Sequence, residues 1–254
     1  MPITPWLVGF GLNAGLLAIA TLAPKKLLTP TGLLHAGALG VILWGTLGWR
    51  GYGVMMFYFL AGSAVTRIGM AEKEALGIAE KRSGARGAGN VWGSALISAF
   101  CALGVYFATW NGSVGAQALV PLLQLGYVAS IGTKLADTCG TEIGQAYGRR
   151  TFLITTLQSV PRGTEGAVSL EGTAAGIVGS TAIATLAWAV GLISPVGIGI
   201  CAIAAFIATN IESLIGATIE GKVGWLTHDV VNILNTLIGA IVAILLALAL
   251  QSAL

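Results

Sequence analysis

Long apolar stretches recur along the whole chain and are separated by shorter polar connections. Most of them are clearly longer than the roughly ten residues that a membrane β-strand needs, so α-helices are expected to satisfy the backbone in lipid. The pattern predicts an all-α fold: a polytopic transmembrane helix bundle of about eight spans, within a range of roughly six to nine, forming one integral membrane domain over residues 1–254. The predicted spans are 3–23, 30–49, 51–66, 91–109, 115–136, 172–193, 196–214 and 230–250.

Composition and charge agree with a membrane protein. The chain is 56% hydrophobic and 9% charged, whereas a soluble domain carries about 25% charged residues. Of its thirteen lysines and arginines all but Arg50 fall on one side of the predicted spans, together with all ten acidic residues. The positive-inside rule makes this side cytoplasmic and places the N-terminus outside. The net charge of +3 indicates no nucleic-acid partner, because the basic residues cluster in these connections. The charged connections are Lys25-Lys26, 67–90, 137–171 and 215–229.

The stretch from 130 to 176 holds the densest candidate chemistry. Read as a helix, it places Lys134, Asp137, Thr138 and Thr141 on one face, with Glu142 one turn beyond Thr138. Polar residues are costly against membrane segments, so this face is more indicative of function than of a solvated helix end. A second face carries small residues at every fourth position, which predicts close approach of a neighbouring helix. These small residues are Gly132, Ala136, Gly140, Gly144 and Gly148.

Arginines and a glycine-rich turn follow this helix and suit phosphate binding. Arg149 and Arg150 come first, and Arg162 stands at the start of the turn. Arginines and glycine backbone next to carboxylates form an arrangement suited to a Mg–nucleotide complex. The turn continues through Gly163, Thr164, Glu165 and Gly166.

Two further connections on the same side carry polar residues. Arg86 and Asn90 stand in a glycine-rich segment just before a predicted helix, where a phosphate nest can form. Glu212 lies near the inner end of another span. In the final helix Asp229 and Asn232 share a face, and Asn235 flanks it. We expect both carboxylates at the site, whereas the two asparagines are equally compatible with hydrogen bonds between helices.

These regions together resemble the phytyl-phosphate kinase family of plants and cyanobacteria, a polytopic membrane family that also has uncharacterised animal relatives. More distantly, Asp137-Thr138 and Thr164-Glu165-Gly166 are similar to motifs of CTP-dependent polyprenol kinases and CDP-diacylglycerol synthases. Those relatives tend to have paired lysines where this chain has Pro161-Arg162-Gly163. The segments that carry the resemblance are EKEALGIAEKRSGARGAGNVWGSA (72–95), KLADTCGTEIG (134–144), PRGTEGAVSLEGTAAG (161–176), NIESLIGATIEGK (210–222) and HDVVNILNTLIGA (228–240).

The resemblance implies a kinase in a bacterial plasma membrane, a thylakoid membrane or a plastid equivalent. It would transfer the γ-phosphoryl group of a nucleoside triphosphate, with CTP the expected donor, to an isoprenoid monophosphate. The product would be phytyl diphosphate for tocopherol and phylloquinone-type prenylquinone synthesis. Two alternatives stay open: a CTP-dependent cytidylyltransferase that makes a CDP-lipid, and a transporter without chemistry.

The same interpretation assigns roles to the candidate residues. Lys134 belongs to the catalytic set, where Asp137 and Glu142 would hold Mg²⁺ and Glu212 or Asp229 would complete the metal site. Backbone N–H groups of Gly163 and Gly166 would approach the phosphates, which Arg86, Arg149, Arg150 and Arg162 would clamp. The other residues expected at the nucleotide are Asn90, Thr138, Thr141, Thr164, Glu165, Asn232 and Asn235. The lipid tail is expected near Phe57, Tyr58, Phe59 and Trp92.

Overall fold

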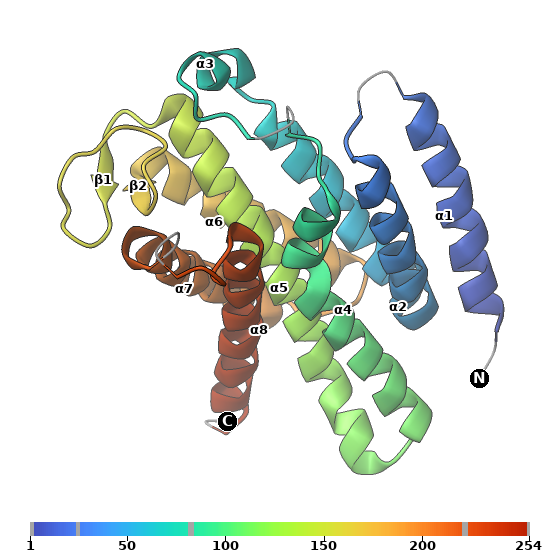
Figure 1. Ribbon diagram of the computed structural model, residues 1–254. Coiled ribbons are helices and arrows are strands. Elements are labelled where there is room, and N and C mark those ends of the chain that lie inside the picture. The colour runs from blue at the N-terminus through green and yellow to red at the C-terminus, as the bar shows by residue number, and fades with distance from the viewer. Residues whose placement is uncertain (1–2, 24–25, 81–83, 220–222, 253–254) are drawn as a thin grey trace.

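The computed structural model describes residues 3–23, 26–80, 84–219 and 223–252, and it is the expected all-α bundle (Figure 1). Within these residues, seven helices are long and apolar enough to cross a membrane. The short helix α3 and a two-stranded antiparallel hairpin lie in the connections. The elements are α1 (Thr4–Leu22), α2 (Pro30–Thr66), α3 (Met70–Ala75), α4 (Ala88–Asn111), α5 (Val114–Tyr147), β1 (Thr151–Leu153), β2 (Ala167–Ser169), α6 (Leu170–Ala189), α7 (Val196–Thr218) and α8 (His228–Ser252).

The helix α2 folds back on itself at Gly48, whose φ of 63° and ψ of −158° are not helical. Both of its ends meet the same residue, Arg86. The backbone N–H of Thr29, at the start of α2, donates to the Arg86 carbonyl at 3.0 Å, and Arg86 Nη1 donates to the Tyr58 hydroxyl in the second arm at 2.8 Å. The two arms therefore run antiparallel, and the seven long helices make eight passes, as the hydrophobic pattern predicts.

Helix α5 is the central element of the bundle and contacts α2, α4, α6, α7 and α8. Its middle is buried on every side, as expected for a helix that is apolar all round. Tyr127, which is fully buried, donates its hydroxyl to the Gly51 carbonyl at 2.6 Å and so fixes α5 to the second arm of α2.

The predicted small-residue face of α5 is the surface on which α6 packs. A Cβ on Gly172 would lie 2.5 Å from the Gly140 carbonyl oxygen, and one on Gly176 would lie 3.0 Å from that of Ala136. Backbones this close exclude larger side chains, which confirms the prediction of close helix approach.

The charged residues collect at one end of the bundle, where α3, the β-hairpin and the start of α8 lie (Figure 1). The start of α1 and the end of α8 lie at the other end. Arg50 also lies at this other end, close to Gly191 in the connection between α6 and α7. A Cβ on Gly191 would be 3.6 Å from Arg50 Nη1. This asymmetry is the one that the sequence predicts, and it defines a polar end of the bundle.

Gly48→Ala is expected to destabilise the protein by about 1–3 kcal/mol, because this backbone conformation is nearly confined to glycine. Gly53→Ala in the second arm of α2 is the matched control. Its added methyl group meets no atom within 4 Å, and alanine favours a helix over glycine by about 1 kcal/mol. Thermal unfolding in detergent should give a lower melting temperature for Gly48→Ala than for Gly53→Ala. Equal melting temperatures would contradict the turn at Gly48.

Candidate active site

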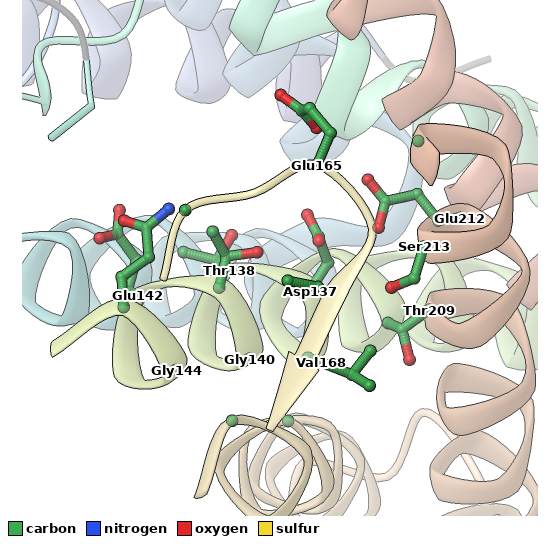
Figure 2. Close-up of a pocket in the computed structure, with 18 of the residues that line it drawn as sticks. Asp137, Thr138, Gly140, Glu142, Gly144, Glu165, Val168, Thr209, Glu212 and Ser213 are labelled. Atoms are coloured by element: carbon green, nitrogen blue, oxygen red, sulfur yellow. The ribbon is translucent and has the colours of Figure 1, made fainter. Parts of the chain in front are cut away.

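A cavity of about 820 Å³ opens at the polar end of the bundle. Ends of α4, α5, α7 and α8 form its walls, and the β-hairpin and the connection after α3 border its mouth. Figure 2 shows the residues of α5, α7 and the hairpin around this space. The cavity brings together most of the residues that the sequence singles out. Those that line it are Arg86, Asn90, Lys134, Asp137, Thr138, Thr141, Glu142, Gly163, Thr164, Glu165, Gly166, Glu212, Asp229 and Asn232.

Lys134 is the buried cation at the floor of this cavity. Only 8% of the residue is exposed. Its Nζ donates to Asp137 Oδ2 on the next turn of α5 at 2.5 Å and to Asn232 Oδ1 on α8 at 2.5 Å. Burial makes an unpaired ammonium costly, so these two oxygens hold the side chain in place. The contact with α8 explains why Asn232 is itself buried.

Asp137 also faces the polar side of α7. It interacts with Glu212 and lies near His228 at the start of α8. Figure 2 shows Glu212 and Ser213 from α7 pointing into the same space as Asp137, with Glu165 of the hairpin on the opposite side. Two neighbouring carboxylates with hydroxyl oxygens nearby are the donors that Mg²⁺ prefers.

The cavity wall is strongly acidic. Among the residues that the structure describes, six carboxylates line it against two side chains with a permanent positive charge, Arg86 and Lys134. A phosphate group entering this space meets net negative charge unless a cation accompanies it. The charge balance therefore favours a phosphate ligand that arrives as a metal complex. The six carboxylates are those of Glu80, Asp137, Glu142, Glu165, Glu212 and Asp229.

Arg86 is held rigidly at the wall of the cavity. Its backbone N–H donates to the Leu27 carbonyl at 2.9 Å, and its guanidinium lies 5.2 Å from the ring centre of Tyr58 and 5.9 Å from that of Phe59. Gly62 leaves room for the side chain, since a Cβ there would lie 2.7 Å from Arg86 Nη2. A fixed guanidinium of this kind is suited to bind phosphate oxygens.

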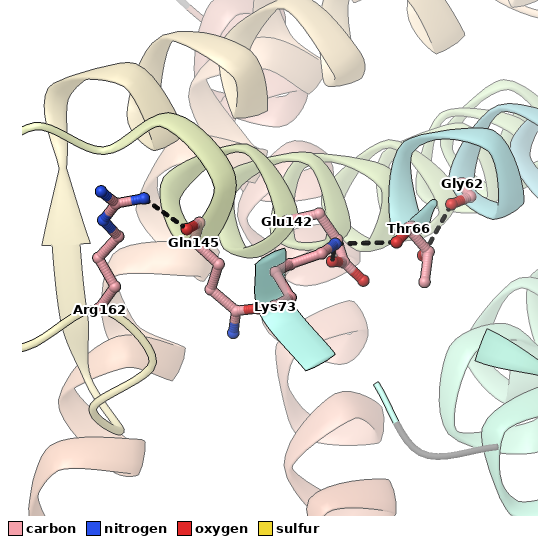
Figure 3. A network of polar contacts seen from close by, with 6 residues as sticks. All are labelled: Gly62, Thr66, Lys73, Glu142, Gln145 and Arg162. Carbon is pink, nitrogen blue, oxygen red and sulfur yellow. Dashed lines mark hydrogen bonds and ion pairs between the residues drawn. The ribbon is translucent and has the colours of Figure 1, made fainter. Parts of the chain in front are cut away.

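Glu142, predicted as a metal ligand, has another role in the structure. It forms an ion pair with Lys73 Nζ of α3, and the same ammonium donates to the Thr66 carbonyl at 2.8 Å (Figure 3). Lys73 is completely buried. The carboxylate of Glu142 therefore compensates a buried charge, and it ties α3 to α5.

The metal ligands expected from the sequence were Asp137 and Glu142, with Glu212 or Asp229 completing the site, and the structure does not gather three of them into one cluster. Across residues 3–23, 26–80, 84–219 and 223–252, no three side chains of His, Cys, Asp and Glu gather as a metal-binding cluster. Two contacts account for this. Glu142 is paired with Lys73, and Asp229 packs against the start of α4, where a Cβ on Gly89 would collide with Asp229 Oδ2. Asp137 and Glu212 remain as a two-carboxylate site, which suits Mg²⁺ when water and phosphate oxygens complete the shell.

Three of the predicted phosphate-binding arginines lie outside the cavity. Arg149 and Arg150 are exposed, because α5 ends at Tyr147 and the chain turns away toward β1. Arg162 Nη1 donates to the carbonyls of Gln145 and Ala146 at 3.3 and 3.1 Å (Figure 3). The last carbonyls of a helix lack partners within it and carry negative partial charge. Arg162 therefore caps α5.

Asn235 is also outside the cavity. It is fully buried between helices, and its side-chain amide has no hydrogen-bond partner within the described part of the chain. The hairpin turn, in contrast, lines the mouth of the cavity. Gly163 and Gly166 have φ angles of 82° and 74°, so the turn depends on glycine at both positions.

Several residues of the cavity wall were not identified from the sequence. On α7, Thr209, Ser213 and Gly216 line it beside Glu212. Their spacing of i, i+3, i+4 and i+7 marks one helix face and would have indicated a polar wall. His228, at the start of α8, also lines the cavity, and no motif spacing points to it.

The chain matches the family described as integral membrane protein DUF92 over residues 13–240. It is 60% identical to an uncharacterised membrane protein of Synechocystis, over 94% of this chain and 90% of that protein. It is 46% identical to the chloroplastic protein VTE6 of Arabidopsis thaliana, over 85% of this chain and 66% of that protein. An uncharacterised membrane protein of Methanocaldococcus jannaschii is 30% identical, over 87% of each chain. No solved structure matches the chain. The plant and cyanobacterial relatives confirm the family resemblance that the motifs indicate.

Lys73→Met is expected to destabilise the protein by about 3–5 kcal/mol, because it leaves the Glu142 carboxylate buried without its cation. The double variant Lys73→Met, Glu142→Leu removes both charges and keeps apolar volume, so it should recover most of this loss. Thermal unfolding in detergent measures both effects. A double variant as unstable as Lys73→Met would contradict the ion pair as the source of the stability.

Proposed function

This chain belongs to the integral membrane protein family DUF92, and on that premise we propose that it is a membrane-bound isoprenoid phosphate kinase. It transfers the γ-phosphoryl group of a nucleoside triphosphate, with CTP the expected donor, to phytyl phosphate or a similar prenyl monophosphate. The resemblance of its motifs to the plant and cyanobacterial phytyl-phosphate kinase family supports this proposal. So does its similarity to the chloroplastic protein VTE6 of Arabidopsis thaliana.

The acidic cavity with two fixed cations is the observation that carries the proposal. Phosphoryl transfer needs positioning, divalent metal and positive charge more than covalent chemistry. Asp137 and Glu212 supply hard oxygen ligands, and Arg86 and Lys134 supply positive charge in the same space. The cavity also opens where the apolar helices end, which is where a soluble nucleotide can meet a lipid head group.

In the proposed reaction, an oxygen of the prenyl phosphate attacks the γ-phosphorus, and the bond from that phosphorus to the β–γ bridging oxygen breaks. The nucleoside diphosphate leaves with the bond's electron pair. The attacking oxygen is already ionised, so a strong general base is not required. Arg86 holds phosphate oxygens, and Lys134, fixed by Asp137 and Asn232, faces the charge that develops during transfer. Bound Mg²⁺, held by Asp137 and Glu212, would neutralise the triphosphate.

We infer that the polar end faces the compartment that holds the nucleotides. The distribution of lysine and arginine supports this orientation, which places the N-terminus on the opposite side.

Purified protein supplied with phytyl phosphate, Mg²⁺ and each of the four nucleoside triphosphates is expected to release a nucleoside diphosphate and form phytyl diphosphate. Asp137→Asn should lower kcat by at least about 100-fold, since it removes one of the two charged metal ligands. Glu74→Gln, which changes an exposed carboxylate on α3, is the control and should retain activity. Pyrophosphate release with a CDP-lipid product would instead identify a cytidylyltransferase, and absence of both products would overturn the proposal.

Arg86→Lys is expected to lower kcat/KM by about 10- to 100-fold, because lysine keeps the charge but loses the planar fork that binds two phosphate oxygens. Arg150→Lys makes the same exchange at an exposed position outside the cavity and should leave kcat/KM unchanged. Steady-state kinetics at varied nucleotide concentration measures both variants. Similar losses in the two would show that Arg86 has no special part in phosphate binding.

A further inference from the structure

A second cavity, of about 300 Å³, lies between the second arm of α2, α5 and α6. All of its lining residues are apolar or small, and three of them are alanines that leave space between the helices. The residues that line it are Phe57, Ala61, Val65, Leu135, Cys139, Ile143, Ala175, Val178, Gly179 and Ala182. We call this space the apolar groove.

The apolar groove opens sideways, toward the region that lipid surrounds. Val178 on α6 is 67% exposed and Phe57 on α2 is 40% exposed, although both belong to membrane-crossing helices. A chain that is itself in the bilayer can therefore enter the groove without passing through water.

The upper end of the apolar groove adjoins the acidic cavity. Val65 and Ile143 line the groove, and their chain neighbours Thr66 and Glu142 line the acidic cavity. Between them lies Lys73, whose ammonium contacts Glu142 and the Thr66 carbonyl (Figure 3). The groove therefore leads from lipid to the Lys73–Glu142 ion pair at the edge of the proposed phosphoryl-transfer site.

We propose that the apolar groove binds the prenyl tail of the lipid monophosphate acceptor, with the phosphate directed past Lys73 into the acidic cavity. This inference rests on the proposed function. An apolar chain that ends in a polar head group matches an apolar groove that adjoins a polar cavity. Of the aromatic residues expected near the tail, only Phe57 lines the groove. Tyr58 and Phe59 contact Arg86, and Trp92 Nε1 donates to His35 Nδ1 at 2.9 Å.

The direct test is photo-crosslinking with a prenyl monophosphate that carries a diazirine on its tail. The reaction is carried out in detergent micelles without nucleotide, and mass spectrometry should locate the adducts on segments 57–65, 135–143 and 175–182. Excess phytyl phosphate should suppress them, whereas phosphatidylcholine should not. Adducts mainly on other helices, or equal suppression by phosphatidylcholine, would overturn the proposal. Because no phosphoryl transfer takes place, the result is independent of the proposed reaction. Groove adducts without kinase activity would leave the tail site standing and reject the kinase.

A pair of variants on α6 tests the same site by kinetics. Ala175→Leu fills the apolar groove and should raise KM for phytyl phosphate about tenfold, while KM for the nucleotide stays unchanged. Ala174→Leu adds the same volume one residue earlier, at an exposed position that does not line the groove. It should leave both constants unchanged. Equal KM values for phytyl phosphate in the two variants would contradict tail binding in the groove.

Discussion

The polar end of the bundle depends on the pairing of one buried charge, the ammonium of Lys134. Removing this group from water is costly, so the fold must supply oxygens around it. Asp137 supplies one from α5 and Asn232 another from α8. Asp137 in turn interacts with Glu212 of α7. The relative positions of three helices therefore follow from one electrostatic requirement, and the cavity that they enclose is shaped by it.

Helix α5 separates two environments by the two faces that it presents. Asp137 and Thr138 line the acidic cavity, whereas Leu135 and Cys139 line the apolar groove. The close backbone contact with α6 leaves no room for larger side chains where the two helices meet. The proposed soluble donor and lipid acceptor would thus approach the same helix from different sides and meet near its polar end.

The features that repeat along one helix could be predicted from the sequence. Periodicity placed Lys134, Asp137 and Thr138 on one face, and it identified the small-residue face that packs on α6. Features that depend on distant partners could not be predicted. Glu142 pairs with a lysine 69 residues earlier, and Arg162 caps a helix that ends before it in the chain. The sequence assigns both residues to the binding site from their charge and position, and only the structure reveals these contacts.

The turn at Gly48 decides the side of the membrane on which the site opens. A straight helix of 37 residues would be about 55 Å long, far more than the roughly 30 Å of hydrocarbon that a bilayer offers. Folding back changes the number of crossings before α4 from two to three. Because each crossing inverts the chain, every later element would face the opposite compartment if α2 crossed once. The single glycine at position 48 therefore sets whether the polar end lies on the same side of the membrane as the start of α1 or on the opposite side.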